Sequence, residues 1–273
     1  MRLAALLALA ATATAQHNAL TPQEKSEGWI LLFDGKTYRH WQDPAKKNVP
    51  GDGWVILDGC LKTVPHARIT EDLLTTDSWD DFDLKFEWKV SAGANTGLKY
   101  RLQHILFIDE QKLQPGPNGF EGLLGREIES PKSDRAHIAP NSRGQEYTIG
   151  FEMQLIDDQR HPDALRGADR QTGSLYSMIA RTQAAAHPAG EWNNARLVVR
   201  GQHVEHWVND VKVLDALLDD PRVKEGVAKR WGPAPAIRML LSRPMTDGPI
   251  GLQHHGDEVW FRDIRIRRIP RED

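Results

Sequence analysis

The sequence is poor in the groups that would cross-link the chain or anchor it in a membrane. Cys60 is the only cysteine, which excludes an intrachain disulfide and a cysteine-based metal site. The one marked apolar run, residues 3–11, is far too short to span a bilayer. The chain must therefore be held together by burial of apolar side chains, and 273 residues are ample for that.

Neither a basic excess nor a nucleotide-binding motif is present. The 35 basic and 38 acidic residues give a formal net charge of −3, which argues against a nucleic-acid partner. The sequence has no glycine-rich phosphate loop, dinucleotide fingerprint, Gly-x-Ser-x-Gly elbow or His-Glu-x-x-His motif. A divalent metal remains an open alternative as cofactor, because His, Asp and Glu can bind one, but no spaced ligand motif identifies it.

The N-terminus has the pattern of an export signal. Arg2 supplies a positive charge before the apolar run, and residues 13–15 offer a small-x-small cleavage site. We expect residues 1–15 to be removed, so that the mature chain begins near Gln16 and is periplasmic or secreted.

Short strands separated by turn residues are expected along most of the chain. Residues 82–90 alternate apolar and charged side chains almost without a break. Two β-rich runs flank Asp58-Gly59, the dipeptide that favours a type I′ hairpin turn. Closely spaced runs between residues 195 and 214 are typical of an antiparallel meander. The other expected strands are residues 29–33, 96–103, 150–156, 249–253 and 259–269.

Helices are expected to be few. Thr21 and Glu24 have the spacing of a capping box, with Pro at the first helical position, and predict one helical turn. Residues 215–231 are the one plausible helical segment, with Pro221 breaking it. Residues 103–149 lose strand periodicity and predict a long, functional excursion with short strands at most. The pattern as a whole predicts an all-β fold, a single domain of residues 16–273 in which two antiparallel sheets form a sandwich or jelly roll.

The stretch from residue 150 to residue 158 predicts a strand with two different faces. Phe151, Met153 and Leu155 lie on one face, and Glu152 and Gln154 on the other. A carboxylate and an amide spaced i, i+2 could bind a hydroxylated ligand. An ordinary half-buried strand with a solvated outer face would give the same pattern.

A set of short motifs, in order along the chain, resembles the 3-keto-disaccharide hydrolase domain family over residues 28–269. The resemblance implies a concanavalin A-like jelly roll whose concave sheet carries the ligand site. Four residues depart from the family pattern: Thr96 for Ser, Asp210 for Gly, Asp263 for Asn and His254 for Asp. The motifs are Leu32-Phe33-Asp34-Gly35, Asn95-Thr96-Gly97-Leu98, Phe151-Glu152-Met153-Gln154, Gly190-Glu191-Trp192-Asn193, Asn209-Asp210, Ile250-Gly251-Leu252-Gln253-His254-His255-Gly256 and Phe261-Arg262-Asp263-Ile264.

The resemblance also implies a substrate whose sugar C3 hydroxyl has been oxidised to a ketone. The ketone acidifies the C2 proton, a base removes it, the enolate expels the aglycone from C1, and water adds later. This chemistry needs one base and groups that stabilise charge on the C3 oxygen, whereas ordinary glycosidases need two carboxylates. Since no dinucleotide site is present, a separate sugar 3-dehydrogenase is expected to make the ketone.

On this interpretation the polar residues of the strands form the site. Glu152 is expected to be the general base, and Lys99 and Arg101 to stabilise the enolate oxygen. His255 is expected to be the acid for the leaving oxygen, because imidazole titrates near neutral pH. The expected substrate-binding residues are Gln154, Asn95, Glu87, Tyr176, Gln253 and Trp192.

Simpler explanations exist for several of these residues. Glu87 fits a charged, solvated strand face, Trp192 fits a core position, and His255 fits a loop. Lys99 and Arg101 could pair with acidic neighbours across the strands. For the whole protein, a non-catalytic carbohydrate-binding module on the same fold is the main alternative. A glucanase-type hydrolase is a weaker one, because residue 156, at i+4 from Glu152, is not a carboxylate.

Overall fold

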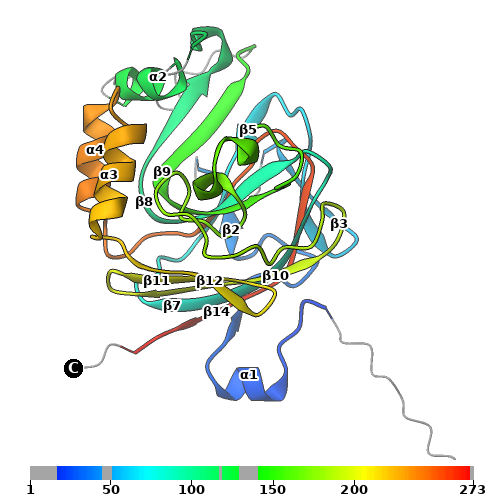
Figure 1. Ribbon diagram of the computed structural model, residues 1–273. Helices are drawn as coiled ribbons and strands as arrows, with labels where there is room; N and C mark the ends of the chain where they lie inside the picture. Colours follow the sequence, from blue (N-terminus) through cyan, green and yellow to red (C-terminus); the bar gives the residue numbers. More distant parts are fainter. Residues whose placement is uncertain (1–16, 45–50, 117–118, 129–140, 271–273) are drawn as a thin grey trace, which may run out of the picture.

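Two β-sheets pack face to face in the computed structural model, which describes residues 17–44, 51–116, 119–128 and 141–270 (Figure 1). The sheets are almost entirely antiparallel and form the predicted jelly-roll sandwich; among the described strands, only β5 and β9 pair in parallel. The expected export signal, residues 1–15, lies outside the described residues. Among the described helices, none is long and apolar enough to cross a membrane.

One sheet has eight strands and runs along the lower side of Figure 1. Its order is β12-β11-β10-β7-β14-β4-β3, with β1 paired to β14. The predicted hairpin is confirmed, since Asp58 and Gly59 have φ values of 51° and 70°, as a type I′ turn requires. The strands are β1 (Ile30–Leu31), β3 (Trp54–Leu57), β4 (Cys60–Thr63), β7 (Phe82–Val90), β10 (Asn193–Arg200), β11 (His203–Val208), β12 (Val211–Leu217) and β14 (Val259–Arg268).

The other sheet has six strands in the order β2-β6-β13-β8-β9-β5. Its two long central strands are paired along most of their length, from Asn95 opposite Ile156 to Asp109 opposite Gly144. The strands are β2 (Trp41–Gln42), β5 (Ile69–Glu71), β6 (Leu73–Thr75), β8 (Asn95–Asp109), β9 (Gly144–Ile156) and β13 (Gly251–Leu252).

The prediction of short strands at most for residues 103–149 is wrong. Strand β8 continues to Asp109 and β9 begins at Gly144, so both strands extend well beyond the sandwich. A β-bulge between Tyr100 and His104 shifts the alternation and hides the strand period in the sequence. Between the two strands lie the 3-10 helix η1 (Glu110–Lys112) and the helix α2 (Gly119–Glu127).

The short capped helix is confirmed, as α1 (Pro22–Ser26) has both hydrogen bonds of the capping box. The expectation that Pro221 breaks a helix is wrong. Strand β12 continues to Leu217, and Pro221 is the first residue of α3 (Pro221–Arg230), where its missing N–H costs nothing. A further helix, α4 (Pro235–Ser242), was not expected, and α3 and α4 lie together beside the sandwich (Figure 1). Two 3-10 turns, η3 (Ala164–Arg166) and η4 (Ala168–Arg170), follow β9.

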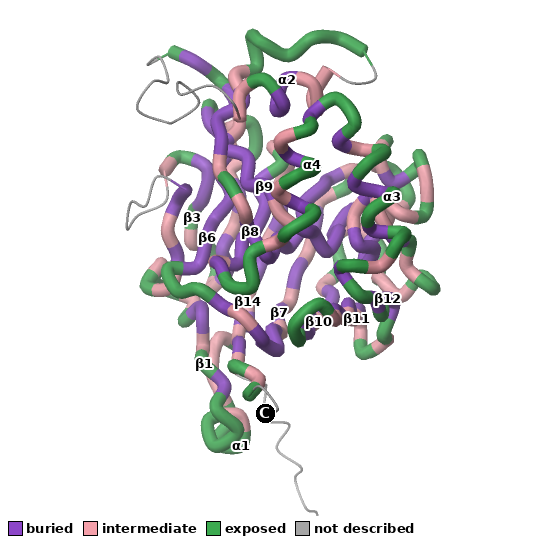
Figure 2. The backbone as a smooth tube through the Cα atoms, turned by 90° about the vertical axis from the view of Figure 1, so that its left-hand side faces the viewer, coloured by how far each residue is buried: buried purple, intermediate pink, exposed green. Residues whose placement is uncertain are grey.

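The core lies between the sheets, where the strands are buried along most of their length (Figure 2). Leu84, Phe86 and Trp88 of β7 supply one side, and Tyr100 and Phe151 of β8 and β9 the other. Because side chains alternate along a strand, the opposite face of β8 and β9 is free to carry polar residues.

Candidate active site

A cleft of about 490 Å³ lies on the outward face of the six-stranded sheet. Strands β8 and β9 and the residues directly after β13 form its floor, the loop after β9 supplies one wall, and α2 and α3 contribute further side chains. The residues that line it are Asn95, Gly116, Phe120, Glu121, Gln145, Tyr147, Glu152, Gln154, His161, Asp163, Arg166, Arg170, Tyr176, Arg230, Gln253 and His255.

Glu152 is the buried carboxyl group of this floor. It lies on β9 opposite Lys99 of β8, and only 6% of it is exposed. Burial raises its pKa to about 7, although the positive charges of Lys99 and Arg230 act in the opposite direction. A carboxyl group with a pKa near neutrality can both take up and return a proton, as a general base must.

Gly97 makes room for this carboxyl group. A Cβ atom at residue 97 would overlap with the side chain of Glu152. Any other residue at this position would push the carboxylate away from the β8 backbone. The sequence motif contained Gly97, but its role becomes visible only when the two strands are paired.

Lys99 lies below the cleft and does not line it. Its side chain is 1% exposed, and its Nζ donates to Asp72 Oδ2 at 2.8 Å and lies 4.0 Å from the centroid of the Tyr147 ring. Burial alone would lower the pKa of Lys99, but Asp72, Tyr147 and Glu152 together raise it above its ordinary value, so the ammonium group stays charged. Lys99 therefore affects Glu152 through its positive charge, which lowers the pKa of the carboxyl group.

Three buried amide atoms in the cleft have no hydrogen-bond partner within the described residues. They are Asn95 Oδ1, Gln154 Nε2 and Gln253 Oε1. Gln154 Oε1 accepts a bond from the Leu155 N–H at 3.1 Å, which leaves only its amide nitrogen free. Buried polar groups are almost always hydrogen-bonded, so these two acceptors and one donor indicate a polar ligand.

A larger hollow, of about 620 Å³, lies beside α3 and α4. Aliphatic side chains such as Val223, Val227 and Leu241 line much of it. Among the described residues around it, no buried side-chain atom lacks a hydrogen-bond partner. The smaller, polar cleft is therefore the better candidate for chemistry.

Tyr176 forms a wall of the cleft through a network that the sequence did not reveal. Its hydroxyl donates to Asp163 Oδ2 at 2.6 Å and accepts from Arg170 at 2.8 Å. The guanidinium of Arg230 lies 4.4 Å from the centroid of its ring. Burial raises the pKa of Tyr176, so the phenol stays neutral. Asp163 and Arg170 come from a loop. Arg230 lies in the segment expected to be helical, but the sequence did not show that this helix borders the cleft.

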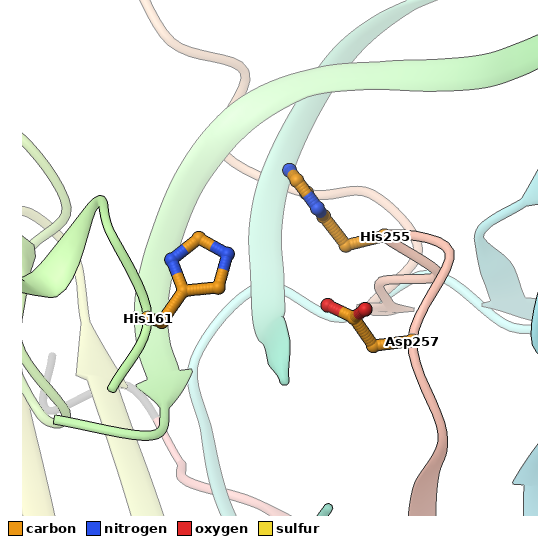
Figure 3. A group of neighbouring side chains, drawn as sticks. All are labelled: His161, His255 and Asp257. Carbon is orange, nitrogen blue, oxygen red and sulfur yellow. The ribbon is translucent and has the colours of Figure 1, made fainter. Parts of the chain in front are cut away.

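His255 faces the cleft and has two polar neighbours, His161 and Asp257 (Figure 3). The two imidazole centroids are 6.2 Å apart and the rings are nearly perpendicular. Although the His255 ring is accessible to solvent, the surrounding protein lowers its pKa, and Asp257 opposes this effect. His161 was not identified from the sequence, because it lies in the polar loop after β9.

The neighbouring His254 is a structural residue. Its Nε2 lies 3.0 Å from the carbonyl oxygen of Val64, and its Nδ1 accepts from the Gly256 N–H at 3.0 Å. Burial lowers its pKa to about 4, so the ring is neutral at physiological pH. Of the adjacent histidines, only His255 belongs to the cleft.

The structure does not bring Arg101 into the cleft. Its φ of 51° marks the start of the bulge in β8, which turns the side chain away from the row of Asn95, Gly97 and Lys99. The guanidinium instead donates to the carbonyl oxygen of Gly201 at 2.9 Å. The simple alternation used to place Arg101 fails at a bulge, and this corrects its expected position.

Glu87 and Trp192 also lie elsewhere, at the outward face of the eight-stranded sheet. Glu87 of β7 accepts from Arg262 Nε at 2.7 Å. The guanidinium of Arg262 lies 3.8 Å from the centroid of the Trp192 ring, and Lys89 lies 5.0 Å from it. The expectation that these two residues share one site with Glu152 is therefore wrong. Strand alternation shows which side chains point away from the core, but it does not show which of the two sheets a strand belongs to.

The chain as a whole is similar to known proteins. The family described as 3-keto-alpha-glucoside-1,2-lyase-like domain matches residues 28–267. A 3-keto-disaccharide hydrolase of Bacteroides thetaiotaomicron is 32% identical over 267 residues, which cover 93% of this chain and 82% of the relative.

Two crystal structures described as putative glycosyl hydrolases, both from Parabacteroides distasonis, have a similar fold. One is 26% identical, with a TM-score of 0.66, over 93% of this chain and all of the other. The second is 22% identical, with a TM-score of 0.56, over 88% of this chain and 99% of the other. The extent of the family match and the identity to the Bacteroides relative show that the chain belongs to the family of 3-keto-alpha-glucoside-1,2-lyase-like domains.

Proposed function

We propose that the chain cleaves 3-keto-glycosides by removal of the C2 proton, elimination of the aglycone and addition of water. The observation that carries the proposal is the Glu152 carboxyl group, which is buried in a polar cleft and has a pKa of about 7. The family of the chain and the name of its Bacteroides relative support the substrate class.

The reaction begins at C2 of the sugar. The C3 ketone makes the C2 proton acidic, Glu152 takes it, and the electron pair moves to the C3 oxygen. When the ketone re-forms, the bond between C1 and the leaving oxygen breaks and a double bond joins C1 and C2. Water then adds at C1, and Glu152 returns its proton to C2, so that the net reaction is hydrolysis.

Charge on the C3 oxygen needs a donor in the cleft, since Arg101 is not there. Gln154 Nε2 is the buried donor without a partner within the described residues, and the charges of Lys99 and Arg230 lie close to Glu152. Preorganised donors and charges of this kind stabilise an enolate as it forms. Asn95 Oδ1 and Gln253 Oε1 accept bonds from sugar hydroxyls, and His255 lies at the end of the cleft that receives the leaving oxygen.

An ordinary two-carboxylate glycosidase fits the cleft less well. Such enzymes need a second free carboxyl group across the scissile bond. In this cleft Asp163 is engaged by Tyr176 and Arg170, and although burial opposes it, these bonds lower the pKa of Asp163. Asp163 therefore stays ionised and bound to its partners. Glu121 of α2 also lines the cleft, and turnover of the unoxidised parent glucoside is the result that would assign it the role of a second carboxyl group.

The proposed substrate must be made by another enzyme. A sugar must be oxidised at C3 before this chemistry can start, and that step requires a hydride acceptor such as a nicotinamide or a flavin. We therefore place a separate sugar 3-dehydrogenase upstream. We also propose export of the protein, supported by the signal pattern of residues 1–15.

The test compares a 3-keto-glucoside with its parent glucoside, using the wild-type protein, Glu152→Gln and Glu87→Gln. Glu87→Gln is the matched control, because it removes a carboxylate from the opposite outer face. We expect aglycone release from the keto form alone, abolished by Glu152→Gln and retained in Glu87→Gln. Binding without turnover in the wild type would favour a carbohydrate-binding module, and turnover of the parent glucoside would favour ordinary hydrolysis.

A further inference from the structure

We propose that His161, His255 and Asp257 bind one divalent transition-metal ion at the end of the cleft. One potential ligand atom from each residue lies within 4.8 Å of the other two. Figure 3 shows the three side chains turned toward a common space, His161 from the loop after β9 and the others from the loop between β13 and β14. Two imidazoles and one carboxylate suit the ions from Mn²⁺ to Zn²⁺ better than Mg²⁺ or Ca²⁺.

Two other groups in the described residues have a similar composition, but their members are paired with one another or with a lysine or arginine. In the first, His203 Nε2 lies 2.7 Å from Asp215 Oδ1, and Lys212 binds the same carboxylate. In the second, His17, Glu87 and Asp263, the histidine contacts Asp263 at 2.5 Å and Arg262 binds Glu87. Among the described residues, no hydrogen bond or ion pair joins His161, His255 and Asp257 to one another.

The carboxylate of Asp257 is held in place before any ion arrives. Its Oδ2 accepts from the backbone N–H of Asn95 at 2.9 Å, which leaves Oδ1 available as a ligand. Its backbone carbonyl accepts from Thr63 Oγ1 at 2.7 Å. A ligand that is oriented by bonds from its surroundings gives a metal site its affinity and geometry.

A second observation comes from the floor of the same cleft. Asn95 Oδ1 and Gln253 Oε1 are acceptors without a partner within the described residues, on side chains that are 5% and 3% exposed. Asn95 provides the N–H that holds Asp257, and Gln253 lies two residues before His255. A carbonyl oxygen has two lone pairs, so each of these oxygens can accept from a water molecule that the cation carries as well as from a sugar hydroxyl.

Binding of an ion requires a change in the hydrogen bonds of His161. The Asp163 N–H donates to His161 Nδ1 at 3.1 Å, so the proton of the neutral ring is on Nε2. Coordination through either nitrogen breaks the bond from Asp163, because Nδ1 then carries either the ion or the proton displaced from Nε2. The loss of this bond opposes binding, so we expect the affinity for the ion to be moderate. We also expect the backbone around residue 163 to shift when the ion binds.

The ion would act as a Lewis acid on a sugar oxygen at this end of the cleft, and this role rests on the proposed function. His255 would then act on the leaving oxygen through the ion. The existence of the site does not depend on the substrate, so metal binding and turnover can succeed or fail separately.

The experiment uses the purified protein without a histidine tag, freed of metal by a chelator. Co²⁺ is titrated and followed by visible absorption, and Zn²⁺ is titrated by calorimetry. We expect one equivalent to bind, with at least tenfold weaker binding in His161→Gln and in His255→Gln. Asp257→Asn keeps an oxygen for the Asn95 N–H but loses the charge, and should also weaken binding.

His203→Gln is the matched control and should bind the ion as the wild type does. Thermal unfolding of each variant shows whether the fold is retained. The proposal is overturned if the wild type binds no ion, if His203→Gln weakens binding as much as His161→Gln does, or if folded His161→Gln and His255→Gln both bind like the wild type. Metal binding without cleavage of a keto-glycoside would contradict the proposed function and leave the metal site standing.

Discussion

Each sheet of the sandwich presents one polar outer face, and the two faces treat their charges differently. On the eight-stranded sheet, Asp83 pairs with Arg196 at 2.6 Å and Arg267 at 3.0 Å, and Glu87 pairs with Arg262. On the six-stranded sheet, the Glu152 carboxyl lies among amide atoms that have no partner within the described residues. In sequence both faces read as polar residues alternating with apolar ones.

The difference indicates where a ligand belongs. Partly exposed ion pairs each contribute about 0–1 kcal/mol and satisfy the groups that they join. A buried polar group without a partner costs about 1–3 kcal/mol. A folded protein that keeps several such groups together gains nothing in stability from them, so they are best explained by a ligand that satisfies them.

Most contacts between tryptophan rings and cations lie on the paired face, although Arg230 of the cleft lies 4.7 Å from the Trp231 ring centroid. Trp29, Trp192, Trp207 and Trp260 each have a lysine or arginine within about 6 Å of the ring centroid, all on the outer face of the eight-stranded sheet. Trp88 and Trp231 are buried. Among the described residues that line the cleft, none is a tryptophan, so recognition there depends on polar atoms and on Phe120, Tyr147 and Tyr176.

The largest expected effect comes from removing one carboxylate from each face, which tests whether only the face with Glu152 is needed for catalysis. Glu152→Gln should lower kcat by roughly 10²–10⁴-fold, the usual contribution of a general base. Glu87→Gln should leave kcat and KM within about twofold of the wild type. Initial rates with a 3-keto-glucoside provide the measurement, and equal losses in both variants would show that the two faces do not differ in function.

The second largest effect concerns stability and pH. The pKa of Glu152 is about 7 in the folded protein, above the ordinary glutamate value of 4.5, so the folded state binds the proton more tightly than the unfolded state. Its contribution to stability is therefore fully present below pH 4.5 and is lost as the pH rises through 7, by up to about 3 kcal/mol. Denaturant unfolding at pH 5 and pH 8 should show this loss in the wild type and not in Glu152→Gln.

The same titration should appear in the rate, with the opposite sign. The base must be ionised to act, so kcat/KM should rise with pH and level off above about 7. A rate that is flat from pH 5 to pH 8 would contradict the assignment of Glu152 as the base.

A third test moves the carboxyl group without removing it. Gly97→Ala places a methyl group where the Glu152 side chain lies, and a displaced base should lower kcat on the order of tenfold to a hundredfold. Gly122→Ala in α2 is the control, because its new methyl group would meet only Arg126 at 3.6 Å. If both variants keep full activity, the position of Glu152 above Gly97 does not matter for catalysis.

Much of the fold could be predicted because its signals are local. Alternation placed β7, and the Asp58-Gly59 turn placed the β3–β4 hairpin. Alternation also put Asn95, Glu152 and Gln154 on one outward face, and the structure brings them into one cleft. These features depend on a period of two residues and a two-residue turn, both of which are visible in the sequence.

The rest of the site could not be predicted because it depends on distant packing. A bulge turned Arg101 away, and a bulge leaves little trace in a single sequence. His161 and Arg170 come from an aperiodic loop, and Arg230 from a helix whose place beside β9 is set by tertiary contacts. Glu87 was misplaced because the alternation is the same on both sheets.

The smallest expected effect lies on the paired face. Arg262→Gln breaks the ion pair with Glu87 and removes the cation from the Trp192 ring. Both groups of the ion pair are partly exposed, with side chains 20% and 24% accessible, so water can solvate what is left. The free energy of unfolding should fall by about 1 kcal/mol or less, and kcat and KM for a keto-glucoside should not change. A clear rise in KM in a folded Arg262→Gln protein would mean that this face also binds substrate, and that paired charges do not mark a face as inert.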